Sequence, residues 1–139
     1  MEATTLQIQT KILKPLSLVW EAYTNDKHIV NWNFASPEWC CPRAETDLKP
    51  GGKFSWRMEA MDGSMGFDFS GAFIEVRPTE KIQMKLDDGR KLLVLMRPLD
   101  KGTEVEINFE PEMQNSPELQ KTGWQAILNQ FKAYCEGLQ

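Results

Sequence analysis

Residues 116–138 read SPELQKTGWQAILNQFKAYCEGL, and this stretch decides the fold. Ser116 is a good N-cap because its hydroxyl can accept a free amide of the first helical turn. Pro117 suits the first helical position, where its missing N–H costs nothing. At about 100° per residue, the apolar side chains fall within an arc of about 120°; they are Trp124, Ile127, Leu128, Phe131, Tyr134, Cys135 and Leu138. The spacing predicts one long amphipathic helix with an aromatic face.

The chain before this helix has the alternating pattern of strands. A central strand, covered on both faces, is indicated by the nearly continuous apolar run at 91–96. Residues 43–47 are a further candidate strand. Turns that carry Gly follow most of these segments, which predicts an antiparallel meander. Apolar and polar residues alternate over 5–12, 54–59, 67–73, 82–86 and 104–109.

Two short helices are expected after the first strand. Pro15 stops that strand and can open a helix over 15–24. Asn25 or Asp26 can cap a second helix that runs through Trp32. A long helix with one wide apolar face must cover a sheet. The predicted class is therefore α+β, a curved antiparallel sheet of six to seven strands around the C-terminal helix, in a single domain over 1–139.

Composition narrows the classes of function. The net charge is −4 with scattered Lys and Arg, which argues against nucleic acid as a partner. No apolar run is long enough for a membrane span, and the N-terminus has no secretion-signal pattern. The three Cys, with Cys40 and Cys41 adjacent, do not form a disulfide framework. We therefore expect a cytoplasmic protein.

Five motifs, in this order, resemble the START-like SRPBCC superfamily, and within it the family homologous to the C-terminal domain of the activator of the heat-shock protein ATPase. They are Pro15…Val19-Trp20…Ile29…Trp32, LKPGGKF at 48–54, Asp62-Gly63, GAFIEVRP at 71–78, and Gly123-Trp124. The resemblance covers nearly the whole chain. It implies a helix-grip fold with a hydrophobic cavity between the sheet and the C-terminal helix. It implies no single activity, because members bind lipids, sterols or polyketides, or act as co-chaperones.

Most candidate ligand-binding residues follow from strand parity and from the face of the C-terminal helix, while Trp32 and Trp39 could close an end of the cavity. Aromatic and Met side chains give flat and adaptable contact area for a ligand. Plain filling of the core is the alternative for each of them. The candidates are Trp32, Trp39, Trp56, Met58, Phe67, Phe69, Met84, Met96, Phe109, Trp124, Leu128 and Phe131.

No catalytic group, metal site or cofactor site is indicated. His28, the one histidine, is expected to be an exposed helix residue without a partner. The sequence has no CxxC or HxxxH pattern for a metal. Arg57, Glu59 and Asp68 are solvated on the outer sheet face unless a bulge turns one of them into the cavity.

Three functions stay open. The first is a small intracellular binding protein for a hydrophobic or aromatic small molecule, lipid-like or polyketide-like, with residues 15–32 gating the cavity. The second is an enzyme of the polyketide cyclase or dehydratase kind. The third is a co-chaperone-like interaction module, for which a chaperone partner is implied by the resemblance alone. Homodimerisation through loop 33–47, with its Phe34 and Trp39, also stays open.

Overall fold

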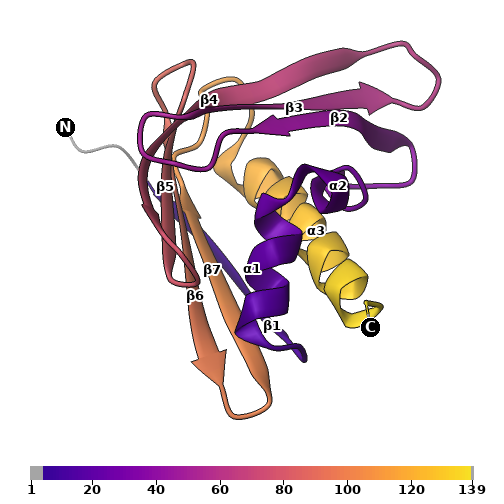
Figure 1. The fold of residues 1–139 in the computed structure, drawn as a ribbon. Coiled ribbons are helices and arrows are strands. Elements are labelled where there is room, and N and C mark those ends of the chain that lie inside the picture. Colours follow the sequence, from indigo (N-terminus) through magenta and orange to yellow (C-terminus); the bar gives the residue numbers. More distant parts are fainter. Residues whose placement is uncertain (1–4, 139) are drawn as a thin grey trace.

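The computed structural model describes residues 5–138, which form a curved sheet with helices on its concave side (Figure 1). In chain order the elements are β1 (Leu6–Ile12), α1 (Leu16–Thr24), α2 (Asp26–Ile29), β2 (Trp39–Thr46), β3 (Lys53–Ala60), β4 (Gly66–Arg77), β5 (Lys81–Leu86), β6 (Lys91–Leu99), β7 (Gly102–Phe109) and α3 (Pro117–Glu136).

The strands form one seven-stranded sheet in the order β1-β7-β6-β5-β4-β3-β2. Every neighbouring pair is antiparallel, and β2 to β7 follow one another as a meander. The first strand joins the last, with Leu6 opposite Phe109 and Ile12 opposite Thr103. These findings confirm the predicted α+β class, the antiparallel sheet and the position of the long helix.

Helix α3 lies across the concave face of the sheet (Figure 1). The Ser116 side chain accepts a hydrogen bond from the Leu119 amide at 3.1 Å, and Pro117 occupies the first turn, as predicted. The buried residues of the face toward the sheet include Leu128, Phe131 and Cys135. No helix within residues 5–138 combines the length and the apolar character that crossing a membrane would require.

The C-terminal half of α3 is tied to β1 by polar contacts. The Lys132 ammonium donates to the Lys11 carbonyl oxygen at 2.6 Å. The Glu136 carboxylate accepts from the Leu13 amide at 3.0 Å and from Lys132 at 3.0 Å. These bonds satisfy backbone groups at the end of β1 and hold the helix along that edge of the sheet.

Strands β2, β3 and the first half of β4 project beyond the rest of the sheet as a three-stranded arm (Figure 1). Strand β3 pairs with β4 from Gly66 to Ala72, whereas β5 pairs with β4 only from Gly71 onward. At Gly71 a Cβ atom would collide with the backbone of Lys85 and Leu86. A glycine is therefore required where β5 meets the arm.

Strand β2 differs from the prediction, since it covers Trp39–Thr46 rather than 43–47. Its pairing with β3 shifts register between Cys40 and Arg43. Pro42 lies at this shift, and proline is tolerated there because β2 is an edge strand that lacks a second neighbour. The proline and the bulge hid the first half of the strand from pattern reasoning.

The short helices also differ at their ends. Pro15 is the N-cap of α1, in extended conformation, and its carbonyl accepts from the Leu18 and Val19 amides. Helix α2 is capped by the Asn25 side chain, as expected, but ends at Ile29. A turn then carries the chain to Trp32.

Candidate functional site

A small cavity of about 50 Å³ lies between the sheet and α3. Its walls come from α1, the segment after α2, four strands and α3. The lining residues are Tyr23, Asn33, Trp56, Phe69, Leu92, Ile107, Trp124, Ile127 and Leu128. Seven of these nine side chains are hydrophobic without a hydroxyl or amide, and none is charged. The arrangement suits an apolar occupant.

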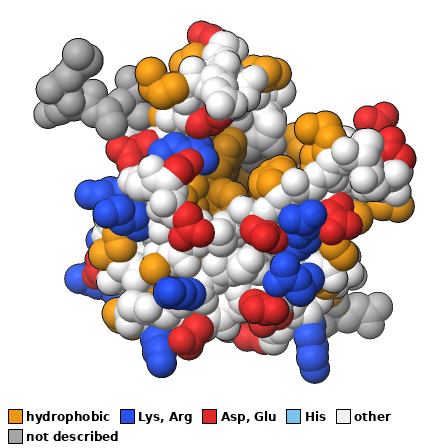
Figure 2. Space-filling view, turned by 90° about the horizontal axis from the view of Figure 1, so that it is seen from above, with side chains coloured by type: hydrophobic (Ala, Val, Ile, Leu, Met, Phe, Trp, Pro, Cys, Tyr) orange, Lys and Arg blue, Asp and Glu red, His pale blue; other side chains and the backbone are white. Residues whose placement is uncertain are grey.

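The mouth of the cavity is formed by the half-buried lining residues. These are Phe69 of β4, and Trp124 and Ile127 of α3. The Phe69 and Trp124 rings meet edge to face, with centroids 5.8 Å apart. Figure 2 shows, from above, a hollow with hydrophobic side chains at its floor. The expectation that residues 15–32 form the gate receives no support from these positions, because that segment supplies a buried wall.

The cavity is small because aromatic side chains fill the adjacent space. Tyr23 stacks on Trp32 at 5.1 Å and meets Phe131 edge-on at 5.4 Å. Trp32 and Phe131 are themselves 4.7 Å apart. Sites for drug-sized ligands occupy roughly 300–1,000 Å³. A ligand larger than a few atoms therefore requires the walls to move.

The predicted site residues fall into three groups. Trp56, Phe69, Trp124 and Leu128 line the cavity. A second group is buried and absent from its lining: Trp32, Met58, Met84, Met96, Phe109 and Phe131. Trp39 and Phe67 lie elsewhere, on the arm, in edge contact at 6.1 Å. Parity places Phe67 on the same face as Phe69, but the arm extends past α3, and Phe67 is 47% exposed.

Sequence reasoning did not select two polar residues of the lining, Tyr23 and Asn33. Helical spacing puts Tyr23 on the buried face of α1, but nothing in that pattern points its hydroxyl to a cavity. Asn33 follows the turn after α2 and is buried, which no propensity predicts. The Asn33 amide donates to the Cys41 sulfur at 3.8 Å. A contact of this kind is visible only in the folded chain.

The buried titratable groups of the core stay neutral. Burial raises the pKa of the Tyr23 hydroxyl far above its ordinary value. Burial likewise raises the pKa of the Cys41 thiol, and it raises the pKa of Cys135 to about 12. The three groups are thus uncharged at neutral pH. The part of the chain that the structure describes also holds no group of three or more His, Cys, Asp or Glu placed to bind a metal ion.

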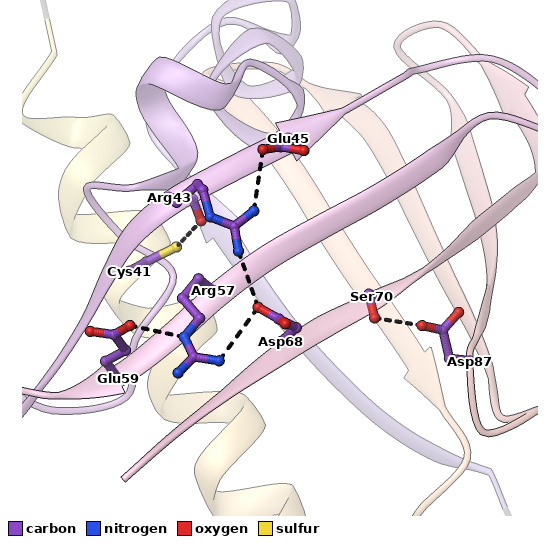
Figure 3. Close-up of polar contacts among 8 residues, drawn as sticks. All are labelled: Cys41, Arg43, Glu45, Arg57, Glu59, Asp68, Ser70 and Asp87. Atoms are coloured by element: carbon purple, nitrogen blue, oxygen red, sulfur yellow. Dashed lines mark hydrogen bonds and ion pairs between the residues drawn. The ribbon is translucent and has the colours of Figure 1, made fainter. Parts of the chain in front are cut away.

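The charged residues of the arm lie on its outer face. Arg57 and Arg43 both point toward the Asp68 carboxylate, at 3.6 Å and 3.3 Å, with α3 behind the strands (Figure 3). Arg57 also donates to Glu59 at 2.9 Å, and this hydrogen bond raises the pKa of the guanidinium. The β3–β4 register has no shift, so these side chains alternate regularly with the buried Trp56. They form a solvated ladder and do not enter the cavity.

The prediction that His28 is exposed and without a partner was wrong in both respects. Its ring is half-buried, and Nδ1 lies 2.6 Å from the Tyr134 hydroxyl oxygen. The pair joins α2 to α3 and lies outside the cavity lining. Its geometry supports a role in packing the two helices.

Comparisons with known proteins agree with this fold. The model of the Activator of Hsp90 ATPase homolog 1-like protein family matches residues 14–136. Among curated proteins none matches the chain. The solution NMR structure of an AHSA1-like protein from Aeromonas hydrophila is 37% identical, with a TM-score of 0.90 over 96% of this chain and 92% of that one.

Two further solved structures are similar. The solution structure of a protein from Cytophaga hutchinsonii is 40% identical, with a TM-score of 0.80 over 96% of this chain and 92% of that one. A crystal structure of a protein from Chromobacterium violaceum shares the fold at 21% identity, with a TM-score of 0.83 over 97% of this chain and 99% of that one. The family match and the first two structures confirm the resemblance seen in the sequence, and the chain belongs to the family of Activator of Hsp90 ATPase homolog 1-like proteins.

Proposed function

We propose that this protein binds a small hydrophobic or aromatic molecule between the sheet and α3. The observation that carries the proposal is the uncharged cavity whose mouth is formed by half-buried Phe69 and Trp124. Large aromatic side chains that are left partly exposed beside a hollow are costly unless another apolar surface covers them. A ligand would supply that surface and remove it from water, at about 25 cal/mol for each Å² of apolar area.

Binding requires α3 and the arm to separate. The C-terminal half of α3 is held on β1 by the bonds of Lys132 and Glu136. At the mouth, α3 contacts the arm through two side chains, Trp124 of α3 and Phe69 of β4. Rotation of these two rings would widen the cavity without breaking a ladder of the sheet. The buried wall from α1 and the sheet would stay in place.

A binding role fits the cavity better than turnover does. A cyclase or dehydratase needs a carboxylate, imidazole or similar group that moves protons at the substrate. Among the described residues, the lining holds only one titratable side chain, Tyr23, and burial raises its pKa far above neutral. His28 and Asp68 lie outside the lining. We therefore place ligand binding ahead of the enzymatic alternative.

Mass spectrometry on the protein purified from its own host tests the proposal. Native spectra are compared with spectra taken after organic extraction. The expected result is a hydrophobic small molecule present at up to one equivalent, which the extraction removes. An unliganded protein that also binds no member of a panel of aromatic and lipid-like compounds, followed by NMR titration, would overturn it.

A second candidate function is supported by an exposed apolar surface on the arm. We call it the tip patch, and it consists of Trp39, Met61, Met65 and Phe67. Met61 and Met65 are 66% and 64% exposed, and Phe67 contacts Trp39. Exposed apolar groups gathered in one place mark interaction sites for proteins. The family name suggests an ATPase of the Hsp90 class as the partner.

A further inference from the structure

Two polar groups lie on the wall of the otherwise apolar cavity. They belong to Tyr23 on α1, which carries a hydroxyl, and to Asn33, which carries a side-chain amide, and both residues line the cavity. The two residues are each only 5% exposed. Buried polar atoms in folded proteins nearly always have a hydrogen-bond partner. The atoms without one therefore carry information about what the cavity holds.

The Tyr23 ring is fixed and its hydroxyl is unpartnered. Trp32 stacks on the ring, and Phe131 and Trp56 meet it edge-on at 5.4 Å and 6.2 Å. No hydrogen bond joins the hydroxyl to a residue in the range 5–138, whereas the half-buried Tyr134 has His28 as its partner. Asp26 Oδ1 is the one fully enclosed side-chain oxygen or nitrogen of this range without a partner, so the Tyr23 oxygen keeps some accessible surface. Because burial raises the pKa of Tyr23, its oxygen keeps its proton and is a hydrogen-bond donor at neutral pH.

The orientation of the Asn33 amide is set by Cys41. The Cys41 thiol donates to the Arg43 carbonyl oxygen at 3.6 Å (Figure 3). Its sulfur can then only accept from Asn33, so the amide nitrogen is the atom that faces the sulfur, at 3.8 Å. The amide oxygen is left without a partner among the described residues. It is a hydrogen-bond acceptor beside the same cavity.

We propose that the ligand carries a hydroxyl group, as a phenol or an alcohol, which accepts a hydrogen bond from Tyr23 and donates one to Asn33. A hydroxyl does both at once, whereas an ether or a carbonyl can only accept. A carboxylate or an amine does not fit, because no charged side chain lines the cavity. The cavity of about 50 Å³ has room for such a group when the mouth is closed, and the rest of the ligand would occupy the space that Phe69 and Trp124 open. This inference rests on the proposed binding function.

The test is an NMR titration of the ¹⁵N-labelled protein with three matched compounds at pH 7: p-cresol, 4-methylanisole and toluene. The resonances of the cavity Trp side chains report where each compound binds. We expect p-cresol to bind roughly 5–10-fold more tightly than either of the others, the effect of one or two net hydrogen bonds. Hydrophobicity alone predicts the opposite order, because toluene is the least soluble in water.

Variants show which groups cause the preference. In Tyr23→Phe and in Asn33→Leu, p-cresol should lose most of its advantage, while toluene binds as before. Tyr134→Phe is the matched control, since its hydroxyl lies outside the lining, and it should keep the wild-type preference. Near-ultraviolet circular dichroism checks that each variant is folded. If a variant does not fold, the comparison of the three compounds on the wild-type protein still tests the proposal.

Two negative results have different meanings. If the three compounds bind equally well to the wild type, the hydroxyl preference is overturned and apolar binding stands, with water bridging the two groups. If none of them shifts a cavity resonance, and larger aromatic compounds also fail, both the inference and the proposed function are overturned.

Discussion

Trp124 of α3 stacks on Phe109 of β7, with ring centroids 4.3 Å apart and 12° between the ring planes. Phe109 is buried, and it lies opposite Leu6 at the start of β1 and opposite Leu92 of β6. The stack therefore joins the N-terminal half of α3 to β7, which lies between β1 and β6 in the sheet. Trp124 also meets Phe69 edge to face at the mouth of the cavity. One side chain thus serves both the packing of the helix and the proposed gate.

We expect Trp124→Ala to lower the free energy of unfolding by about 2–4 kcal/mol, since a half-buried Trp loses its packing and a stacking partner. The variant should also bind aromatic ligands more weakly, because one wall of the site is gone. Urea denaturation and NMR titration measure the two effects. Lys121→Ala, an exposed change one turn earlier, is the control and should alter neither. Equal effects from both variants would argue against α3 as a wall of the site.

Replacing either of two glycines by alanine should change the stability of the protein, in opposite directions. At Gly71 a Cβ would meet the backbone of Lys85 and Leu86, which cannot move aside without distorting the β4–β5 ladder. We expect Gly71→Ala to destabilise the protein by about 2–4 kcal/mol. At Gly123, inside α3, a Cβ would meet nothing within 4 Å.

Gly123→Ala should therefore stabilise the protein by about 0.5–1 kcal/mol, because alanine loses less backbone entropy in a helix. Thermal melting of both variants is the measurement. A Gly71→Ala protein as stable as the wild type would show that β5 can move away from the arm at this position.

The arrangement of the secondary structure was accessible from the sequence because it follows local rules. Ser116 and Pro117 mark the start of α3, and alternation along β3 separates buried Trp56 from half-buried Arg57 on the outer face. The placement of Phe67 was not accessible, because parity gives the face of a strand but not the point where the covering helix ends. Trp39 was expected to close an end of the cavity, but it lies on the arm beside Phe67, in the first half of β2 that the pattern did not predict.

The size and polarity of the cavity could not be predicted from the sequence. Its volume depends on how Tyr23, Trp32 and Phe131 pack together, which no single position determines. The Asn33 acceptor depends on a chain of contacts through Cys41 to the carbonyl of Arg43. Both features arise from segments that are distant in the sequence and meet only in the folded chain.

The link between Glu136 and the end of β1 predicts a pH dependence. Hydrogen bonds from the Leu13 amide and from Lys132 hold the pKa of the Glu136 carboxyl below its usual value. A carboxyl whose folded-state pKa is depressed stabilises the fold above its unfolded pKa of roughly 4.3, and this contribution is lost as the pH falls through the folded value.

Glu136→Gln should therefore be less stable than the wild type at pH 7, and the difference should shrink as the pH falls below about 4. Urea denaturation at a series of pH values measures it. Glu38→Gln, on the exposed loop before β2, is the control and should differ little from the wild type throughout. A stability difference at Glu136 that is constant with pH would show that the carboxylate charge plays no part.

The second candidate function predicts that a substitution in the tip patch weakens binding to the partner protein. If the patch binds an Hsp90-class ATPase, Phe67→Ser should weaken that binding by at least about tenfold, because aromatic side chains dominate such interfaces. The folded state should change little, since Phe67 is 47% exposed. Leu99→Ser is a matched control, because Leu99 is 41% exposed on β6, away from the arm.

Surface plasmon resonance with the immobilised ATPase, together with light scattering at rising protein concentration, separates the outcomes. Loss of ATPase binding in Phe67→Ser alone supports the interaction role. The wild-type protein could instead form dimers without binding the ATPase. If those dimers are lost in Phe67→Ser, the patch binds a second copy of this chain. Equal behaviour of Phe67→Ser, Leu99→Ser and the wild type in both measurements removes the second candidate, because the most exposed aromatic side chain of the arm would then contribute to no interface.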